Sequence, residues 1–306
     1  MPVSGQNVGF VGLGAMGAPM AERLVGAGFS VTVFDPSAQA MARLERAGAH
    51  GAPSPAAVAD RAEIVVACLP DPEVSRQVAF GPGGVVEGTA ARIYVETSTI
   101  GMKAMREIDE RLARAGIGVV DAPVSGGPNG ARAGTLSMMV AARPRDRSAA
   151  EATLSATADR IFTVAEEPGL GQVMKLANNI MTHTNLLIAC EAVAMGVKAG
   201  LDAALMIDVI NRSTGRNQAS ETKFPKSILP RSFDYGARLA IPCKDMALAA
   251  EEARMLGVPN GISGAVLAVF REAVAEGMGE DDFTAIFRLY ERKAAFPYPG
   301  KGIPAA

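Results

Sequence analysis

Three glycines near the N-terminus constrain the fold of this chain more than any other feature. The segment Gly12-Leu13-Gly14-Ala15-Met16-Gly17 follows an apolar, strand-like run and leads into a helix-like stretch. In that context Gly12 allows a tight turn, Gly14 lets backbone amides approach a phosphate, and Gly17 lets the helix pack closely on the strand. The alternative is a glycine-rich turn without a ligand. The spacing favours a strand, turn and helix that bind a pyrophosphate.

A carboxylate follows at the distance that such a turn requires. Asp35 lies 21 residues after Gly14, at the end of the next strand-like run, and Pro36 and Ser37 after it supply no guanidinium group. A carboxylate there accepts hydrogen bonds from a ribose 2′-hydroxyl and repels a 2′-phosphate. An ordinary aspartate that caps the next helix is the alternative. The pattern predicts NAD as the cofactor in preference to NADP.

The first half of the chain alternates strand-like and helix-like segments, which is typical of βαβ units on a parallel sheet. The predicted strands are Asn7 to Val11, Ser30 to Phe34, Ile64 to Cys68, Ile93 to Glu96, Gly118 to Asp121 and Leu136 to Val140. The predicted helices between them are Pro19 to Ala27, Ser37 to Ala47, Pro72 to Phe80 and Lys103 to Ala115. We therefore expect an α/β fold with a doubly wound sheet that ends near residue 165.

The second half of the chain predicts helices alone. They are Gln172 to Ala199, Ala203 to Ser213, Lys244 to Leu256, Gly261 to Glu276 and Phe283 to Ala295. We expect a cofactor-binding domain over residues 1–168 and an all-helical domain for substrate binding and oligomerisation over residues 169–306. A long helix between the domains would begin the second one.

Composition excludes several classes of function. Lys plus Arg number 30 against 32 for Asp plus Glu, so no single-sign field is available to hold nucleic acid or an acidic membrane surface. The 2 histidines and 3 cysteines show no metal-ligand spacing, and we expect no metal site.

Three scattered cysteines and an N-terminus without a leader pattern favour the cytoplasm. The apolar stretch Ile180 to Leu201 contains charged residues and favours a buried helix over a membrane span.

Two segments offer groups for chemistry beside a dinucleotide. Lys175 and Asn179 stand four residues apart on one face of a predicted helix, among apolar neighbours that would lower the pKa of the amine. Ser125, Gly126 and Gly127 follow a predicted strand and could offer a hydroxyl and two open backbone amides to a carboxylate. A solvated helix face and a plain turn are the respective alternatives. We interpret His183, one helical step further on, as a core histidine.

Four stretches together resemble the β-hydroxyacid dehydrogenase family, which includes 3-hydroxyisobutyrate dehydrogenase and tartronate semialdehyde reductase. They are the glycine turn, DAPVSGG at 121–127, GQVMKLANN at 171–179 and KDMALA at 244–249. Their order and spacing extend over nearly the whole chain. The resemblance implies an N-terminal Rossmann domain, a helical C-terminal domain of the 6-phosphogluconate dehydrogenase kind, and reversible oxidation of a small 3-hydroxy acid.

The resemblance also implies roles for individual residues. Lys175 matches the catalytic lysine, Asn179 an asparagine that helps to hold the substrate, and Ser125 to Gly127 the loop that binds the substrate carboxylate. The residues that match cofactor-binding positions are Gly12, Leu13, Gly14, Ala15, Met16, Gly17, Asp35, Leu69, Pro70, Val74, Thr99 and Lys244. Many relatives have a polar residue at the position of Val74, and Lys244 could instead pair with Asp245. Ser213 to Asn217 matches a loop near the substrate tail.

Two other functions remain open at this point. An imine reductase would have a similar fold and glycine turn, but that group usually lacks a lysine at the position of Lys175. A non-catalytic NAD-binding sensor would not need Lys175, Asn179 or the Ser-Gly-Gly loop. By resemblance we expect a homodimer or homotetramer that acts on a small carboxylate such as 3-hydroxyisobutyrate or a glycerate-like compound.

Overall fold

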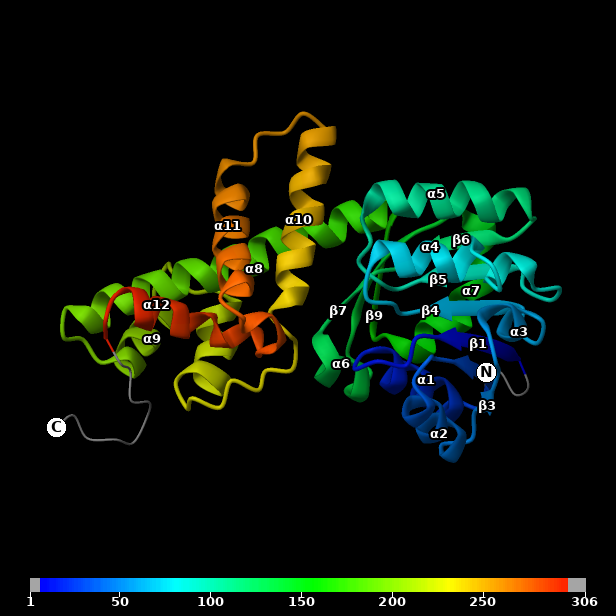
Figure 1. Ribbon diagram of the computed structural model, residues 1–306, viewed down its shortest axis with the longest axis horizontal. Helices are drawn as coiled ribbons and strands as arrows, with labels where there is room; N and C mark the ends of the chain where they lie inside the picture. The colour runs from blue at the N-terminus through cyan, green and yellow to red at the C-terminus, as the bar shows by residue number, and fades with distance from the viewer. Residues whose placement is uncertain (1–5, 297–306) are drawn as a thin grey trace. The chain divides into compact units, whose positions relative to one another are not determined.

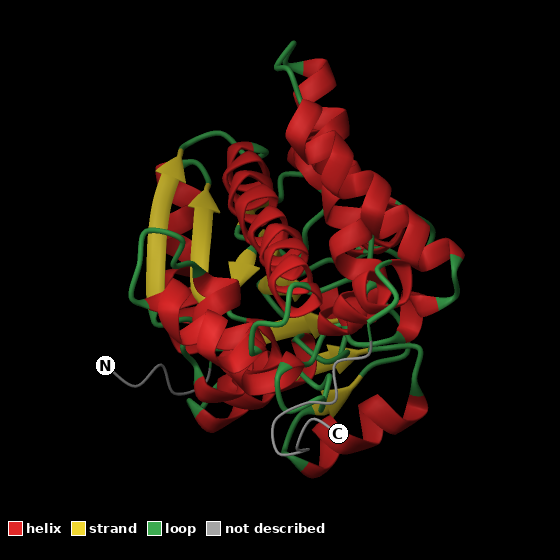
Figure 2. Cartoon of the chain, turned by 90° about the vertical axis from the view of Figure 1, so that its left-hand side faces the viewer, coloured by secondary structure: helices red, strands yellow, loops and turns green. Residues whose placement is uncertain are grey.

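The computed structural model describes residues 6–296 of the chain (Figure 1). The protein divides into two compact units, Met1–Lys175 and Leu176–Ala306. The division falls inside helix α8, Leu170–Lys198, whereas the sequence places a boundary between residues 168 and 169, just ahead of this helix. The strands of the sheet all lie in the first unit (Figure 2, strands in yellow).

The sheet of the first unit has the strand order β3-β2-β1-β4-β5-β6-β8-β7, and β9 pairs with β8. The strands are β1 Asn7–Val11, β2 Ser30–Phe34, β3 His50–Gly51, β4 Ile64–Ala67, β5 Ile93–Glu96, β6 Gly118–Asp121, β7 Val124–Ser125, β8 Ser137–Ala141 and β9 Arg160–Ala165. The pairs from β3 to β6 are parallel, and β8 runs antiparallel to β6 and β7. Because β1 lies centrally, its end and that of β4 form the point where the strand order reverses.

Helices cover the sheet because alternate strand residues point to opposite faces. The helices are α1 Gly17–Gly26, α2 Ala38–Arg46, α3 Pro55–Ala59, α4 Pro72–Phe80, α5 Gly101–Arg114, α6 Gly127–Ala133 and α7 Pro144–Thr157, with a 3₁₀ turn η1 at Val85–Glu87. Val8 and Phe10 of β1 belong to one buried cluster, whereas Val11 belongs to another with Tyr94 and Ile108. Two separate cores, one on each face, confirm the predicted doubly wound fold.

The second unit is helical. Its elements are the larger part of α8, α9 Ala203–Asn211, a π-helix η2 Ala219–Ile228, α10 Ala240–Met255, α11 Gly261–Ala275, the 3₁₀ turns η3 Met278–Glu280 and η4 Phe283–Ile286, and α12 Phe287–Lys293. Leu186 and Cys190 of α8 share one core with Phe224, Phe270 and Phe287. The predicted helical second domain is thus confirmed.

Helix α8 carries a continuous buried stripe along its length. The buried side chains at helical spacing are Gln172, Lys175, Asn179, His183, Leu186, Cys190 and Val193. By length and composition α8 is also, within residues 6–296, the one helix that could cross a membrane, with 44% of its most apolar window buried. Core helices of soluble proteins pass the same test, and the apolar end of the stripe is packed in the core of the second unit.

The sequence prediction missed the 14-residue helix α7, the shorter helices α3 and α6, and several strands and turns that are short or irregular. Strands β3 and β7 have two residues each, too few for an alternating pattern. Strand β9 lies at the edge of the sheet and is mostly exposed, so no apolar run marks it. The π-helix contains Pro225, which lacks the N–H that a regular helix needs. The last predicted helix, Phe283 to Ala295, is divided into η4 and α12.

Candidate functional site

The glycine turn between β1 and α1 has the geometry that the sequence predicts. Gly12 has a positive φ of +90°, and a Cβ there would lie 2.3 Å from the carbonyl oxygen of Cys68. A Cβ on Gly17 would lie 1.9 Å from the Gly12 carbonyl oxygen, so only glycine lets α1 begin this close to the turn. A Cβ on Gly14 would meet nothing within 4 Å. The exposed backbone at Gly14 and Ala15 is therefore open to an anion at the helix N-terminus.

Asp35 lies directly after β2 and is joined to this turn. Its Oδ2 accepts a hydrogen bond from the Leu13 backbone N–H at 2.7 Å, and its Oδ1 accepts one from the Ser37 N–H at 2.8 Å. The helix cap itself is supplied by Ser37, whose Oγ accepts from the Ala40 N–H. Each carboxylate oxygen has a second lone pair for a further donor, so the position fits a ribose hydroxyl.

The loops after β4 and β5 lie at the same edge of the sheet, because neighbouring parallel strands end together. The Leu69 N–H donates to Ser98 Oγ at 2.6 Å and joins the two loops directly. Pro70 is exposed and Thr99 is half-buried. Val74, in the first turn of α4, is 36% exposed, and its N–H donates to the cap residue Asp71. These residues form one edge with the glycine turn of β1.

A buried polar network follows β6. Asp121 and Gln172 are both 0% exposed, and Gln172 Nε2 donates to Asp121 Oδ1 at 2.7 Å. Asp121 Oδ2 accepts from the backbone N–H groups of Gly169 and Gln172, at 2.8 and 3.2 Å. Burial raises the pKa of Asp121 to about 7, although these three N–H donors favour its ionised form. Neighbouring Glu96 is also buried, and its pKa is raised by desolvation.

The Ser-Gly-Gly loop joins β7 to α6. Ser125 is half-buried, whereas Gly126 and Gly127 are exposed and have φ values of +137° and +64°. Side chains rarely adopt these backbone angles, so both glycines are required by the turn. The N–H groups of this loop lie at the surface of the first unit, where they can meet a carboxylate.

Lys175 and Asn179 lie on the buried stripe of α8, one turn apart. They are 8% and 6% exposed. Asn179 Nδ2 donates to Asp245 Oδ2 at 2.8 Å, and Asp245 Oδ1 forms an ion pair with Lys244 Nζ at 3.2 Å. The asparagine amide is thereby oriented by a buried carboxylate on α10. Lys244 does pair with Asp245, the alternative that the sequence left open.

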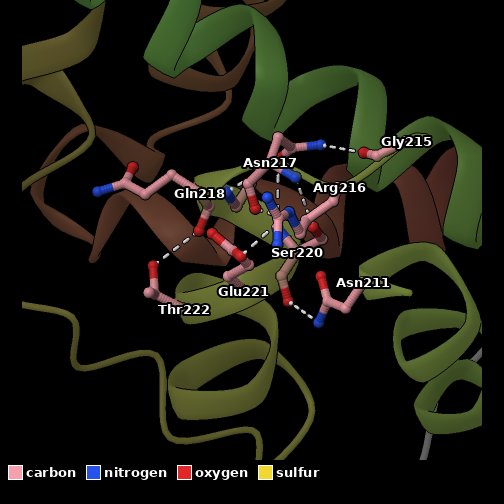
Figure 3. Close-up of polar contacts among 9 residues, drawn as sticks. Asn211, Gly215, Arg216, Asn217, Gln218, Ser220, Glu221 and Thr222 are labelled. Atoms are coloured by element: carbon pink, nitrogen blue, oxygen red, sulfur yellow. Dashed lines mark hydrogen bonds and ion pairs between the residues drawn. The ribbon is translucent and has the colours of Figure 1, made fainter. Parts of the chain in front are cut away.

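The loop from Ser213 to Asn217 is engaged in local structure (Figure 3). Asn217 Oδ1 accepts from the N–H groups of Ala219 and Ser220 and so begins the π-helix. Arg216 is exposed and forms an ion pair with Glu221 at 3.5 Å. Both side chains thus make contacts within their own segment of the chain.

Four polar residues near these elements were not predicted as site residues: Asp121, Gln172, Asp245 and Lys223. The first three lie inside the sequence motifs described above, where a charged or amide side chain in an apolar segment could have indicated a buried polar site.

No such pattern marks Lys223. It is 2% exposed, donates to Gln218 Oε1 at 2.6 Å, and burial lowers its pKa to about 8. His183 packs edge-to-face on Phe270, as a core histidine does.

Known proteins share this arrangement along nearly the whole chain. Residues 7–165 match the NAD-binding domain of 6-phosphogluconate dehydrogenase, and residues 169–290 match the NAD-binding domain described for NADP-dependent 3-hydroxyisobutyrate dehydrogenase. The fold and the glycine turn therefore define an oxidoreductase with an NAD(P)-binding domain.

Individual relatives narrow this class. The chain is 33% identical to 2-(hydroxymethyl)glutarate dehydrogenase of Eubacterium barkeri, over 96% of this chain and 98% of the relative. It is 34% identical to 3-hydroxyisobutyrate dehydrogenase of Pseudomonas aeruginosa, over 94% and 99%. The structure of Mycobacterium tuberculosis 3-hydroxyisobutyrate dehydrogenase with L-serine is similar at a TM-score of 0.85 and 30% identity, covering 93% of this chain and 98% of that one. The chain belongs to the β-hydroxyacid dehydrogenase family and is an oxidoreductase of the 3-hydroxyacid dehydrogenase type.

The raised pKa of Asp121 predicts how stability changes with pH. The Asp121 carboxyl has a pKa of about 7 in the folded protein and of about 4 in the unfolded chain. Its contribution to the free energy of unfolding is therefore fully present below pH 4 and is lost as the pH rises through 7. Each unit of pKa shift corresponds to about 1.4 kcal/mol. Urea unfolding of wild type and Asp121→Asn at pH 5, 6, 7 and 8 measures this effect. The advantage of wild type over the variant should be largest at pH 5 and shrink toward pH 8, and a constant difference would contradict the assignment.

Proposed function

We propose that this protein transfers a hydride reversibly between NAD and a small 3-hydroxy acid, with Lys175 as the general acid and base. The observation that carries the proposal is a buried lysine one helical turn from an asparagine whose amide is held by Asp245. A buried amine beside a fixed amide suits proton transfer at one defined atom. The substrate class that we infer is 3-hydroxyisobutyrate or a glycerate-like acid, with tartronate semialdehyde as the corresponding aldehyde.

The residues divide the chemistry between them. A bound nicotinamide supplies the hydride acceptor or donor. In oxidation the neutral Lys175 amine removes the substrate hydroxyl proton as the C–H bond breaks, and in reduction the ammonium returns a proton to the developing alkoxide. Ser125 and the N–H groups of Gly126 and Gly127 bind the substrate carboxylate. Asn179 holds the substrate in line with the amine.

The cofactor is proposed to lie along the edge formed by the glycine turn and the loops after β2, β4 and β5. Open space over Gly14 and the α1 N-terminus suit the pyrophosphate, and Asp35 suits an unphosphorylated ribose. Leu69, Pro70, Val74 and Thr99 would line the remaining length of the cofactor. Lys244 of α10 matches a further cofactor-binding position of the family.

Replacement of the proposed acid and base should remove the chemistry and leave cofactor binding intact. We expect Lys175→Ala to lower kcat by about 10²- to 10⁴-fold, the typical contribution of a general acid or base. NADH formation is followed by absorbance with 3-hydroxyisobutyrate, glycerate, threonate, serine and 4-hydroxybutyrate, and NADH affinity by fluorescence. Lys103→Ala, an exposed lysine on α5, is the control and should match wild type. Full turnover by Lys175→Ala would overturn the role of this lysine.

The choice of cofactor is tested by the same fluorescence titration. NADH should bind at least about tenfold tighter than NADPH, because the Asp35 carboxylate repels a 2′-phosphate. Asp35→Asn should narrow this ratio, since a neutral amide neither repels a phosphate nor accepts from two hydroxyls as a carboxylate does. Asp60→Asn, at the exposed end of α3, serves as control. Equal affinities in wild type would show that Asp35 does not select the cofactor.

We further propose that the protein works as a homodimer or homotetramer in the cytoplasm. Opposite to its buried stripe, α8 exposes Met174, Met181, Ile188 and Met195 at seven-residue intervals, with Met181 and Met195 68% and 72% exposed. An apolar stripe with this repeat fits a helix of a second copy. The three cysteines are free, which fits a reducing compartment.

Charge placed on this exposed stripe should separate the copies. For wild type we expect light scattering after size exclusion to give at least twice the 31.6 kDa of one chain. Met181→Glu combined with Ile188→Glu should give the mass of one chain, because buried unpaired carboxylates are costly at an apolar interface. Ala42→Glu on α2, also exposed, should leave the mass unchanged. A wild-type mass of one chain would contradict the proposal.

A further inference from the structure

Gln172 uses the full hydrogen-bonding capacity of its side chain while completely buried. Its Oε1 accepts from the backbone N–H groups of Ile100 and Gly101, at 2.8 and 3.1 Å. Its Nε2 donates to the carbonyl oxygen of Ser98 at 3.1 Å and to Asp121 Oδ1 at 2.7 Å. Two acceptor and two donor contacts are all that an amide can make, so this side chain has one orientation. Most of these partners are more than 70 residues away in the sequence.

The same network holds the beginning of α8 from a second direction. Asp121, at the end of β6, accepts from the Gly169 and Gln172 backbone N–H groups, which α8 itself leaves without partners. The backbone of the first turn is therefore fixed to the sheet by a carboxylate, and its side chain at Gln172 is fixed by the loop after β5. The first turn of α8 is thus attached to the sheet through its backbone and also through one side chain.

The network also reaches the loops proposed to hold the cofactor. The Ser98 carbonyl oxygen accepts from Gln172, while Ser98 Oγ accepts from the N–H of Leu69. Thr99 lies between Ser98 and Ile100, and both neighbours are bonded to Gln172. The cofactor edge and the beginning of α8 are thus joined through one amide side chain.

Lys175 follows Gln172 by three residues, on the same face of α8. The separation corresponds to about 4.5 Å along the helix axis, less than one turn. General acid and base catalysis needs a heavy-atom distance of about 2.6 to 3.2 Å, and a misplacement of 1 Å can cost about 10²-fold in rate. The orientation of α8 relative to the cofactor loops therefore decides where the lysine amine lies.

We propose that Gln172 is a positioning residue, whose amide holds the Lys175 amine in register with the cofactor-binding loops that follow β4 and β5. This inference rests on the proposed function, because it gives Gln172 its effect through Lys175. Gln172 acts without touching substrate or cofactor. Its four hydrogen bonds restrict the N-terminal turn of α8 to one position relative to these loops.

Gln172→Met tests the proposal, because methionine has a similar length and makes none of these hydrogen bonds. We expect kcat per folded site to fall about 10- to 100-fold, with NADH affinity by fluorescence within about threefold of wild type. Gln77→Met, an exposed glutamine on α4, is the matched control and should keep the wild-type kcat. A folded Gln172→Met enzyme with wild-type kcat would overturn the proposal.

A double-mutant cycle separates this proposal from the role of Lys175. If Gln172 acts through the lysine, adding Gln172→Met to Lys175→Ala should lower the residual turnover no further. An equal loss in both backgrounds would show that Gln172 acts independently of Lys175 and would overturn the positioning role. Full turnover of Lys175→Ala alone would instead overturn the proposed function.

Gln172→Glu provides a second variant if the methionine variant does not fold. One carboxyl oxygen can still accept from Ile100 and Gly101, but the other would face Asp121 Oδ1, with Glu96 as a further nearby carboxyl. When protonated, this glutamic acid can donate to Asp121 as the amide does. Its single O–H cannot also donate to the Ser98 carbonyl oxygen, so we expect kcat below that of wild type at pH 6 and at least tenfold lower again, relative to wild type, at pH 9. A ratio that stays constant with pH would overturn the proposal.

Discussion

The attachment of helix α8 to the end of strand β6 supports the rest of the site. The Asp121 carboxylate accepts the N–H groups that begin the helix, and Gln172 joins the same carboxylate to the loop after β5. Every one of these groups is buried, where an unmade hydrogen bond would cost about 1 to 3 kcal/mol. These hydrogen bonds therefore favour one position of the first turn of α8, and this position sets the location of Lys175.

One face of helix α8 carries both the polar residues of the proposed site and apolar residues of the core. Because residues three and four apart share a helix face, one stripe contains Gln172, Lys175 and Asn179 near its beginning and Leu186 and Cys190 further along. The polar part carries the proposed proton transfer, whereas the apolar part belongs to the core of the second unit. The side chains proposed to act in proton transfer therefore lie on the same helix face as residues of a large apolar core, whose close packing resists rotation of the helix.

Sequence patterns predicted most regular elements of the fold, although not helix α7, and identified the motifs of the proposed site. Strands β1, β2, β5 and β6 have the predicted bounds, since buried parallel strands appear as short apolar runs between turns. The predicted start of α10 at Lys244 is late, because Pro242 lies in the first turn of a helix that begins at Ala240. The two-residue strands and the proline-containing π-helix have no periodic pattern from which they could be predicted.

The sequence by itself determined the features that depend on local geometry. These are the glycine turn, the alternation of strands and helices, and the one-turn spacing of Lys175 and Asn179. Only the tertiary structure decided which distant groups form hydrogen bonds. Asn179 bonds to Asp245, which is 66 residues away in the sequence, and Gln172 bonds to Ile100, which is 72 residues away. Such contacts follow from how whole elements pack, which no local spacing encodes. The raised pKa of Asp121 has the same origin, because desolvation exists only once the surrounding elements have closed over the carboxyl.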